Sequence, residues 1–242
     1  MNDMIDLFAT AKPTTLTFDC YGTLIDWEGG AAKALRDIYG FSQDHVSDEA
    51  LIDMFLELDT VEIRKGIFPY SSVLENVADQ ISERLLGRAD PELGKKFPQS
   101  LPTWPVFDET NEALAQLGGH FRLAIISNVD DGLISQTLNN ISVRFDTVVT
   151  SQQVHSYKPD ISIFEQALHS LDETPSKVIH IAEGLCEARP ARALGMNSIW
   201  VERSSRSEDK SGATPHAKAP CLMAIVEAAN AAQQLEADKH NS

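Results

Sequence analysis

Five short apolar runs, separated by stretches with helical spacing, constrain the fold of this 242-residue chain more than any other feature. Their sequences are TLTFDC at 15–20, RLAIIS at 122–127, DTVVTS at 146–151, KVIHIA at 177–182 and NSIWVE at 197–202. Short runs that are apolar on both faces are typical of parallel strands with helices packed on each side of the sheet. We therefore predict an α/β fold built on a doubly wound parallel sheet.

A long and mostly helical insertion separates the first predicted strand from the second. Its apolar residues recur at helical spacing, so each set lies on one helical face: Leu51, Phe55 and Leu58, then Val73, Val77 and Ile81. The exit stretch FPQSLPTWP at 97–105 contains prolines, which disfavour helix and indicate a linker. We therefore predict a core domain of residues 1–27 and 103–242 and a helical cap domain of residues 28–102.

The stretches at the two ends of the sequence are polar or acidic. The first residues contain Asp3 and Asp6 and lack a basic start followed by an apolar run, so no secretory signal is expected. No segment approaches the roughly 18 consecutive apolar residues of a membrane span. Residues 204–220 are expected to form a polar loop, and the closing EADKHNS is expected to fray.

The balance of charged residues restricts the partners of the protein. There are 36 acidic and 20 basic side chains, and the formal net charge of -16 repels phosphate backbones and anionic membranes. The three cysteines are odd in number and lack metal-type spacing, so neither a disulfide framework nor a zinc site is expected. We expect a cytoplasmic protein with no nucleic-acid or membrane partner.

An aspartate directly follows the apolar part of the first predicted strand. In a parallel α/β sheet the carboxyl ends of the strands form the ligand crevice, so Asp19 is placed for chemistry there. Gly22 lets the chain turn sharply just after it. Taken alone, an aspartate in this place is more often a turn former or a helix cap than a nucleophile. The residues that follow the other strands decide between these interpretations.

Four sequence motifs follow the predicted strands in order. They are DCYGTLIDW with Asp19, LAIISN with Ser127 and Asn128, YKPDISIF with Lys158, and IAEGLCEARPARALGM with Glu183 and Glu187. In this order they resemble the four motifs of the haloacid dehalogenase superfamily of hydrolases. The resemblance covers about residues 15–201, and the helical insertion lies where this family places its cap. It implies a Rossmann-like core with an inserted helical cap.

The resemblance assigns roles to the motif residues. Asp19 is the expected nucleophile, whose carboxylate forms a covalent ester or acyl phosphate and divides one displacement into two steps. Lys158 is expected to hold Asp19 ionised and correctly aimed, because a nearby opposite charge favours the charged form. The Thr23 and Ser127 hydroxyls, with the Asn128 side chain, are expected to bind the anionic group of a small substrate. Outside this motif series, Lys158 would be interpreted as a surface lysine and Ser127 as a strand-end cap.

The residue two positions after the nucleophile distinguishes the reactions of this superfamily. Its phosphatases have an aspartate there that protonates the leaving alcohol, whereas this chain has Tyr21, as in the branch that resembles 2-haloacid dehalogenases. Halide leaves without a proton, but an alkoxide needs one, and loss of a positioned general acid costs about 10²–10⁴-fold in rate. We therefore expect a dehalogenase that hydrolyses a carbon–halogen bond of a small carboxylate without a cofactor, with Tyr21 near the substrate and Glu187 aiding the water.

Three departures from the dehalogenase pattern indicate a different pocket. The pattern has an arginine near the start of the first cap helix, where DEALIDMFLELD has none; Arg64 and Arg36 are the nearest candidates, and Arg64 is the predicted substrate ligand. Phe164 stands where the pattern has a tyrosine. Ala182 and Gly184 replace its Ser-x-Asn. The substrate is therefore expected to differ from the simplest haloacids.

Two other functions fit parts of the sequence. Glu183 and Glu187 keep the acidic spacing that holds Mg²⁺ in the phosphatases, where Asp19, the Tyr21 backbone carbonyl and Glu183 would be the metal ligands. The missing arginine favours instead a catalytically silent core that binds a metabolite or a protein through its cap. Neither the physiological substrate nor the oligomeric state follows from the sequence, and a homodimer is one option.

Several conspicuous residues have simpler interpretations. His180 lies within an apolar run, where a histidine that packs in the core is expected more often than a catalyst. Trp27 and Trp104 bracket the insertion and are expected to pack at the hinge. Asp130 and Asp131 most simply begin the next helix.

Overall fold

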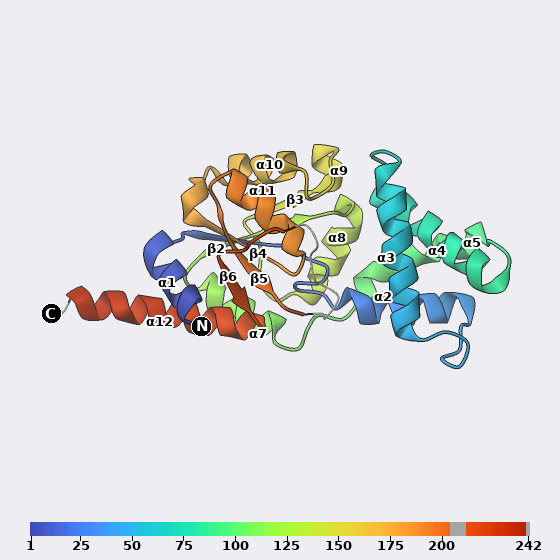
Figure 1. Ribbon diagram of the computed structural model, residues 1–242, viewed down its shortest axis with the longest axis horizontal. Coiled ribbons are helices and arrows are strands. Elements are labelled where there is room, and N and C mark those ends of the chain that lie inside the picture. The colour runs from blue at the N-terminus through green and yellow to red at the C-terminus, as the bar shows by residue number, and fades with distance from the viewer. Residues whose placement is uncertain (204–211, 241–242) are drawn as a thin grey trace.

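A parallel sheet forms the centre of the molecule. The computed structural model describes residues 1–203 and 212–240, and within them the six-stranded sheet has the order β3-β2-β1-β4-β5-β6 (Figure 1). The strands are β1 Thr15–Phe18, β2 Arg122–Ser127, β3 Thr147–Thr150, β4 Val178–Ala182, β5 Asn197–Val201 and β6 Ala217–Ala219. All neighbouring strands are parallel. The predicted fold class is therefore confirmed.

Strand β1 lies where the strand order changes direction. Phe18 pairs with Ile125 of β2 on one side and with Ile181 of β4 on the other. The chain leaves the strand after Phe18, and the Asp19 backbone N–H still donates to the Ile181 carbonyl at 3.0 Å. Such a switch point at the carboxyl edge is where open α/β sheets bind ligands. The fold therefore places Asp19 at the position most suited to chemistry.

Helices cover both faces of the sheet, as a doubly wound fold requires. The core helices are α1 Asn2–Ala11, α7 Thr110–Gly118, α8 Asp131–Thr137, α9 Ser151–Val154, α10 Ile161–Leu171, α11 Ala188–Ala193 and α12 Leu222–His240, with short 3₁₀ turns η2 Leu138–Asn140, η3 Pro175–Lys177 and η4 Leu185–Glu187. Ile125 belongs to an apolar cluster that includes residues of α1, α7 and α12. Its neighbour Ile126 belongs to a second cluster with residues of α10 and α11. Successive strand residues point to opposite faces, so these two clusters lie on opposite sides of the sheet.

The edge strand β6 was not predicted. It lies within the stretch 204–220, which was expected to be a polar loop. Ala217 and Ala219 are buried and Lys218 is exposed, which is the alternation of a strand with one covered face. Three residues are too few for this alternation to stand out in a polar sequence. Residues 204–211 of the same stretch lie outside the described part of the chain.

The closing stretch EADKHNS is more ordered than expected. Helix α12 continues through His240 and packs against α1, and residues 241–242 lie outside the described residues. An ion pair of 2.7 Å joins Lys12 to Glu236. Neither α12 nor any other helix of the described residues has the length and apolar character needed to cross a bilayer.

The helices of residues 27–103, here called the cap, lie together at one end of the molecule (Figure 1). They are α2 Trp27–Tyr39, α3 Asp48–Arg64, α4 Tyr70–Leu86, α5 Pro91–Gly94, α6 Lys96–Ser100 and the 3₁₀ turn η1 Leu101–Thr103. The predicted apolar faces of α3 and α4 are confirmed, since every residue named for them is buried. Ser47 begins α3 by accepting a hydrogen bond from the Ala50 N–H at 3.2 Å.

The proline-rich exit of the cap is helical as far as Thr103, although its prolines were expected to disfavour helix and to indicate a linker over 97–105. Pro98 lies in the first turn of α6, and Pro102 lies at the start of η1. A proline is tolerated in a first turn because its missing N–H would have no intrahelical partner there. Phe97 and Leu101 are buried, so packing stabilises these two short elements.

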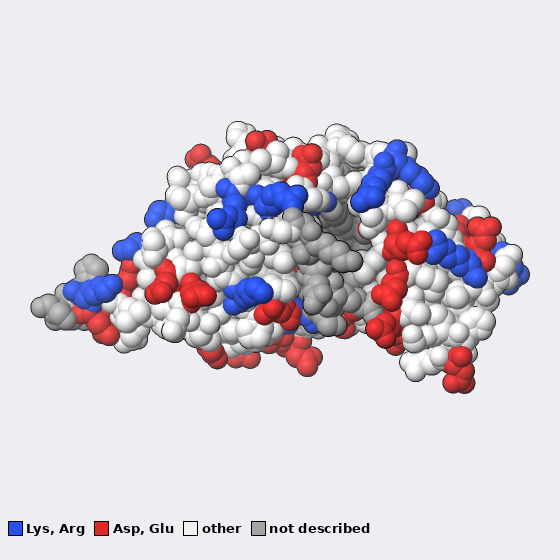
Figure 2. All heavy atoms as spheres, in the orientation of Figure 1, with Lys and Arg blue, Asp and Glu red and all other residues white. Residues whose placement is uncertain are grey.

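A cavity of about 250 Å³ lies between the core and the cap. The carboxyl edge of the sheet lines one side of it, here called the core wall, and helices of the cap line the other, here called the cap wall. Figure 2 shows that the molecule is hollowed between these two parts. Residues of all four sequence motifs therefore line the cavity.

Candidate active site

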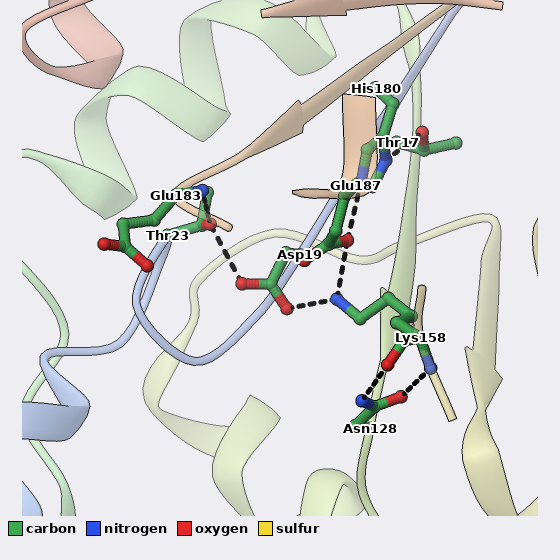
Figure 3. A network of polar contacts seen from close by, with 8 residues as sticks. All are labelled: Thr17, Asp19, Thr23, Asn128, Lys158, His180, Glu183 and Glu187. Carbon is green, nitrogen blue, oxygen red and sulfur yellow. Dashed lines mark hydrogen bonds and ion pairs between the residues drawn. The ribbon is translucent and has the colours of Figure 1, made fainter. Parts of the chain in front are cut away.

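Asp19 is held at the carboxyl edge of β1 with both carboxylate oxygens engaged (Figure 3). Lys158 Nζ donates to Oδ1 at 2.6 Å, and Thr23 Oγ1 donates to Oδ2 at 3.1 Å. Gly22 makes the turn between Asp19 and Thr23 with a φ of 102°, in the left-handed region that favours glycine. A Cβ at this position would also lie 3.1 Å from the Trp27 ring. The motif DCYGT thus presents the carboxylate together with its hydroxyl partner.

Lys158 lies between two carboxylates. Its Nζ is 2.6 Å from Asp19 Oδ1 and 2.8 Å from Glu187 Oε2, and all three side chains are buried. Burial alone would lower the pKa of Lys158, but the charges of Asp19 and Glu187 raise it above its ordinary value. Lys158 therefore stays protonated through the neutral pH range, as its expected role requires.

The ionisation of Asp19 depends on this lysine. Burial raises the pKa of Asp19, Lys158 opposes that rise, and the charge of Glu187 adds to it, with a net upward shift. For Glu187, burial alone would raise the pKa, but Lys158 and His180 lower it below its ordinary value. One ammonium therefore supports a candidate nucleophile and a second carboxylate that remains ionised at lower pH.

Asn128 fixes the backbone of Lys158, although it was expected to bind the substrate. Its Oδ1 accepts from the Lys158 backbone N–H at 2.7 Å, and its Nδ2 donates to the Lys158 carbonyl at 3.2 Å. This pair of bonds engages both polar atoms of the amide. Ser127, the preceding residue, is buried and lines the cavity. Asn128 lines the cavity as well, so substrate binding by Ser127 and Asn128 stays a prediction.

His180 belongs to the site, which the sequence analysis missed. Its Nε2 lies 2.9 Å from Glu187 Oε2, and its Nδ1 lies 2.9 Å from Thr17 Oγ1 (Figure 3). Thr17 and His180 are partners in the register of β1 and β4, and Asp19 follows Thr17 on the same face of the sheet. The alternation of Thr17 with Asp19 was a signal in the sequence, but the pairing of the two strands was not. His180 therefore orients the Glu187 carboxylate from within the core.

Gly184 makes room for the longer acid at position 187. A Cβ at Gly184 would lie 2.8 Å from Glu187 Oε1, closer than real Cβ atoms approach such a group. The dehalogenase pattern has asparagine at this position together with an aspartate at the later acidic position. Glycine at 184 therefore leaves room for the glutamate at 187, which gives the departure at 184 a steric reason.

Glu183 contacts the nucleophile loop through its backbone. Its N–H donates to Thr23 Oγ1 at 2.9 Å, and its carbonyl accepts from Trp200 Nε1 at 2.8 Å. The side chain lines the cavity but points away from the contacts of Asp19 (Figure 3). The described residues contain no group of three His, Cys, Asp or Glu side chains arranged to hold a metal ion. Mg²⁺ binding by Asp19, the Tyr21 carbonyl and Glu183 stays a prediction.

Tyr21 lines the cavity as a packing residue and a hydrogen-bond partner of the core. Its hydroxyl lies 2.8 Å from Thr137 Oγ1, and its ring meets Trp104 edge to face at 6.0 Å. Burial raises the pKa of Tyr21 above its ordinary value of about 10. The phenol is therefore a poor proton donor at neutral pH, in agreement with the argument from leaving groups.

The two predicted replacements for the missing arginine lie elsewhere. Arg64 is exposed at the end of α3 and is not among the residues that line the cavity, which corrects its assignment as a substrate ligand. Arg36 forms an ion pair of 2.6 Å with Asp48 and donates to the Val46 carbonyl, so it stabilises the cap. Phe164, where the pattern has tyrosine, packs edge to face on the His180 ring at 5.1 Å.

Aromatic and leucine side chains make up most of the cap wall. Trp27 and Phe55 have ring centroids 5.4 Å apart, and Trp104 packs beside them on Tyr21. The predicted hinge tryptophans therefore line the cavity. Asp59 is the carboxylate of this wall, and its Oδ1 accepts from the Tyr70 hydroxyl at 3.0 Å. Asp59 was not among the predicted site residues.

Asp130 joins the cap to the core. It stands at the N-cap of α8, as expected, but its side chain makes no cap bond there. Its two carboxylate oxygens instead accept from the backbone N–H groups of Tyr70 and Ser71 at 2.8 and 2.9 Å. These are the first residues of α4, where the positive end of the helix dipole favours an acid. The contact holds the cap over the cavity.

Comparisons with known proteins agree with the motifs. The sequence model of the family described as haloacid dehalogenase-like hydrolase matches residues 16–201. The (S)-2-haloacid dehalogenase of Pseudomonas sp. (strain YL) is 28% identical over 124 residues, 50% of this chain and 53% of that protein. The (S)-2-haloacid dehalogenase 1 of Pseudomonas sp. (strain CBS-3) is 25% identical over 204 residues, 80% of this chain and 86% of that protein. The first match thus spans about half of its relative's length and the second most of it.

Solved structures show the same fold. The L-2-haloacid dehalogenase from Xanthobacter autotrophicus with chloropropionic acid covalently bound has a TM-score of 0.77 to this chain. The match covers 89% of this chain and 97% of that one, at 17% sequence identity. A likeness at this identity concerns the fold, whereas the family model also includes the motif residues. The chain belongs to the haloacid dehalogenase-like hydrolase family.

Proposed function

We propose that this hydrolase cleaves a carbon–halogen bond through a covalent ester on Asp19. The arrangement of Asp19, Lys158 and Glu187 carries the proposal, because one ammonium joins a candidate nucleophile to a candidate base. Tyr21 supports it as well, since this residue provides no proton for an alkoxide leaving group. The relatives named as 2-haloacid dehalogenases support the same reaction.

In the first step, an oxygen of the Asp19 carboxylate attacks the carbon that bears the halogen. The new carbon–oxygen bond forms as the carbon–halogen bond breaks, and halide leaves with the bonding electron pair. Lys158 keeps Asp19 ionised before the attack and pairs with Glu187 once Asp19 is esterified. No proton is transferred in this step, so no general acid is required.

In the second step, water attacks the carbonyl carbon of the Asp19 ester while Glu187 accepts a proton from it. Lys158 stabilises the negative charge that develops on the carbonyl oxygen. The bond between that carbon and the ester oxygen, which came from Asp19 and is now joined to the substrate carbon, then breaks, and the alkoxide takes the proton back from Glu187. Asp19 loses its remaining proton to solvent, so the products are an alcohol, a halide and one proton.

A Mg²⁺-dependent phosphatase is the second candidate, because Glu183 and Glu187 line the same cavity as Asp19. Bound Mg²⁺ would neutralise phosphoryl charge there. The geometry favours the dehalogenase reaction, since Glu187 is already engaged by Lys158 and His180. Tyr21 also favours the dehalogenase reaction, because it replaces the aspartate that protonates the leaving alcohol in the phosphatases.

The test measures halide and phosphate release from matched substrates, with and without a chelator. The substrates are alkyl halides that carry a carboxylate, a hydroxyl or an amine, and the phosphate esters of the corresponding alcohols. Chelator-resistant halide release, lost by at least about 10³-fold in Asp19→Asn with an unchanged melting temperature, is expected. Chelator-sensitive phosphate release without halide release would overturn the proposal, and no product from any substrate would favour a silent binding protein.

A further inference from the structure

We infer that the cap wall selects a substrate with an aromatic or other apolar body and a protonated amine that Asp59 binds, and that it disfavours carboxylates. As a substrate assignment this rests on the proposed function, but the binding preference can be measured without turnover. The charges of the cavity, its aromatic rings and the position of Asp59 each support it.

The charged side chains that line the cavity are mostly acidic. Asp19, Asp59, Glu183 and Glu187 contribute four carboxylates, and within the described residues Lys158 is the only lysine or arginine that lines it. The Lys158 charge is already matched by Asp19 and Glu187 at 2.6 and 2.8 Å. Among the residues that the structure describes, no cation is then left to pair with a substrate carboxylate, which meets a negative field, whereas an ammonium group is attracted.

The aromatic rings provide a surface for an apolar body and for a cation. Trp27, Phe55, Tyr70, Trp104 and Tyr21 all line the cavity. A cation over the face of such a ring is attracted by its quadrupole, most strongly with tryptophan. A flat or aliphatic body fills the remaining space against the leucines of the cap, Leu56, Leu74 and Leu101. The wall therefore suits an amine on an apolar body better than a small, strongly hydrated anion.

Asp59 is placed to receive the amine. It lies one helical turn after Phe55 on α3, so the two side chains share a helical face. In the described part of the chain, the Tyr70 hydroxyl is its single hydrogen-bond partner, and it engages Oδ1. Burial raises the pKa of Asp59 to about 6, so the carboxylate is charged at about pH 8. Since Asp59 and Asp19 line one cavity, an amine at Asp59 leaves the rest of the substrate facing the nucleophile.

Three halogen-free probes of similar size test the preference in the wild-type protein. They are 2-phenylethylamine, 2-phenylethanol and phenylacetate, titrated at about pH 8 and low salt by calorimetry and by the fluorescence of the cavity tryptophans. The amine is expected to bind at least about tenfold more tightly than phenylacetate, with the alcohol between them. Equal or tighter binding of phenylacetate would overturn the inference.

Asp59→Asn tests whether this carboxylate is the cause. Its amide has nearly the same shape, so amine affinity should fall several-fold towards that of the alcohol, while alcohol affinity changes by less than about twofold. Asp53→Asn is the matched control, because Asp53 lies on the same helix, is exposed and does not line the cavity. An unchanged amine affinity in Asp59→Asn would contradict the assignment.

The same probes separate this inference from the proposed function. Amine binding that depends on Asp59, with no halide release from any substrate, would support the binding site and reject the dehalogenase reaction. Halide release from a 2-halocarboxylate at a higher kcat/KM than from its amine counterpart would support the reaction and reject the substrate class. Both proposals are supported if the amine-bearing halide has the highest kcat/KM and Asp59→Asn removes its advantage.

Discussion

The core wall and the cap wall of the cavity differ in how their polar groups are satisfied. On the core wall, Asp19 and Glu187 each have two side-chain partners, and both meet at Lys158. On the cap wall, the Asp59 carboxylate has the Tyr70 hydroxyl as its single side-chain partner among the described residues. A network of paired groups fixes the geometry for one reaction, whereas a less fully paired carboxylate is available to a ligand. Under the two proposals above, the core wall carries the chemistry and the cap wall the selectivity.

Among the partners of Asp19 and Glu187 on the core wall, Lys158→Met should produce the largest loss. Without the ammonium, nothing of its strength opposes the effect of burial on the pKa of Asp19, which rises further. Halide release should fall roughly 10²–10³-fold, and the remaining activity should require a higher pH. A pH–rate profile measures both effects. Lys33→Met removes an exposed cap lysine as a control, and Lys158→Arg keeps the charge if the methionine variant folds poorly. A wild-type profile in Lys158→Met would show that Asp19 does not depend on Lys158.

His180→Ala should have the next largest effect, since His180 holds Glu187 without facing the substrate. Loss of the imidazole removes one cause of the lowered pKa of Glu187, so the base becomes protonated at higher pH. We expect kcat to fall on the order of tenfold or more, with KM little changed and the acid limb of the kcat profile moved to higher pH. His180→Gln should recover part of kcat. A drop in thermal stability with an unmoved profile would assign His180 to packing alone.

Asp59→Asn should change stability in a pH-dependent manner. The folded-state pKa of about 6 lies above the ordinary value of 3.8, so Asp59 favours the folded state at low pH and loses that contribution as the pH rises through 6. The amide should therefore stabilise the protein by on the order of 2 kcal/mol at about pH 8 and have little effect at about pH 4. Denaturant unfolding at the two pH values measures this difference. Destabilisation at about pH 8 would mean that the wild-type carboxylate is paired with a cation.

Gly184→Ala should have the smallest effect and would sharpen the account of the core wall. The added Cβ displaces Glu187 Oε1, at a cost on the order of 1 kcal/mol and a several-fold loss of kcat. In the double variant Gly184→Ala/Glu187→Asp, the shorter acid makes room for the added Cβ. Its loss of kcat should therefore be smaller than the product of the losses in the two single variants. Gly132→Ala, where a Cβ meets nothing within 4 Å, is the control. If the losses of the two single variants simply add in the double variant, positions 184 and 187 do not interact in the way proposed.

Much of the core wall could be predicted from the sequence. Strands are buried on both faces, so their apolar runs stand out, and Asp19, Ser127 and Glu183 each come at or just after the end of one. Parallel strands bring such ends to one edge of the sheet. The contact of His180 with Thr17 could not be predicted, because it depends on which strand lies beside β1.

The cap wall could be predicted less well. Helical spacing predicted the buried faces of α3 and α4. It did not predict the residues of α3 that line the cavity, because buried Phe55 and Asp59, one turn later, both do so. Arg64 lies at the end of the same helix and is exposed. This could not be predicted, because the direction of its side chain depends on how α3 is rotated against α4. The prolines at 98 and 102 were misleading, since packing of the cap decides whether so short a stretch is helical.

A single turnover in water labelled with heavy oxygen tests the central claim most directly. Wild-type enzyme in excess over an organic halide that it hydrolyses is quenched, and the oxygen of the alcohol and of the peptide containing Asp19 is analysed by mass spectrometry. If Asp19 attacks carbon, the product alcohol carries unlabelled oxygen from Asp19, and the Asp19 peptide gains one heavy oxygen. Heavy oxygen in the alcohol and none in the peptide would mean that water attacks the substrate directly, which contradicts the account.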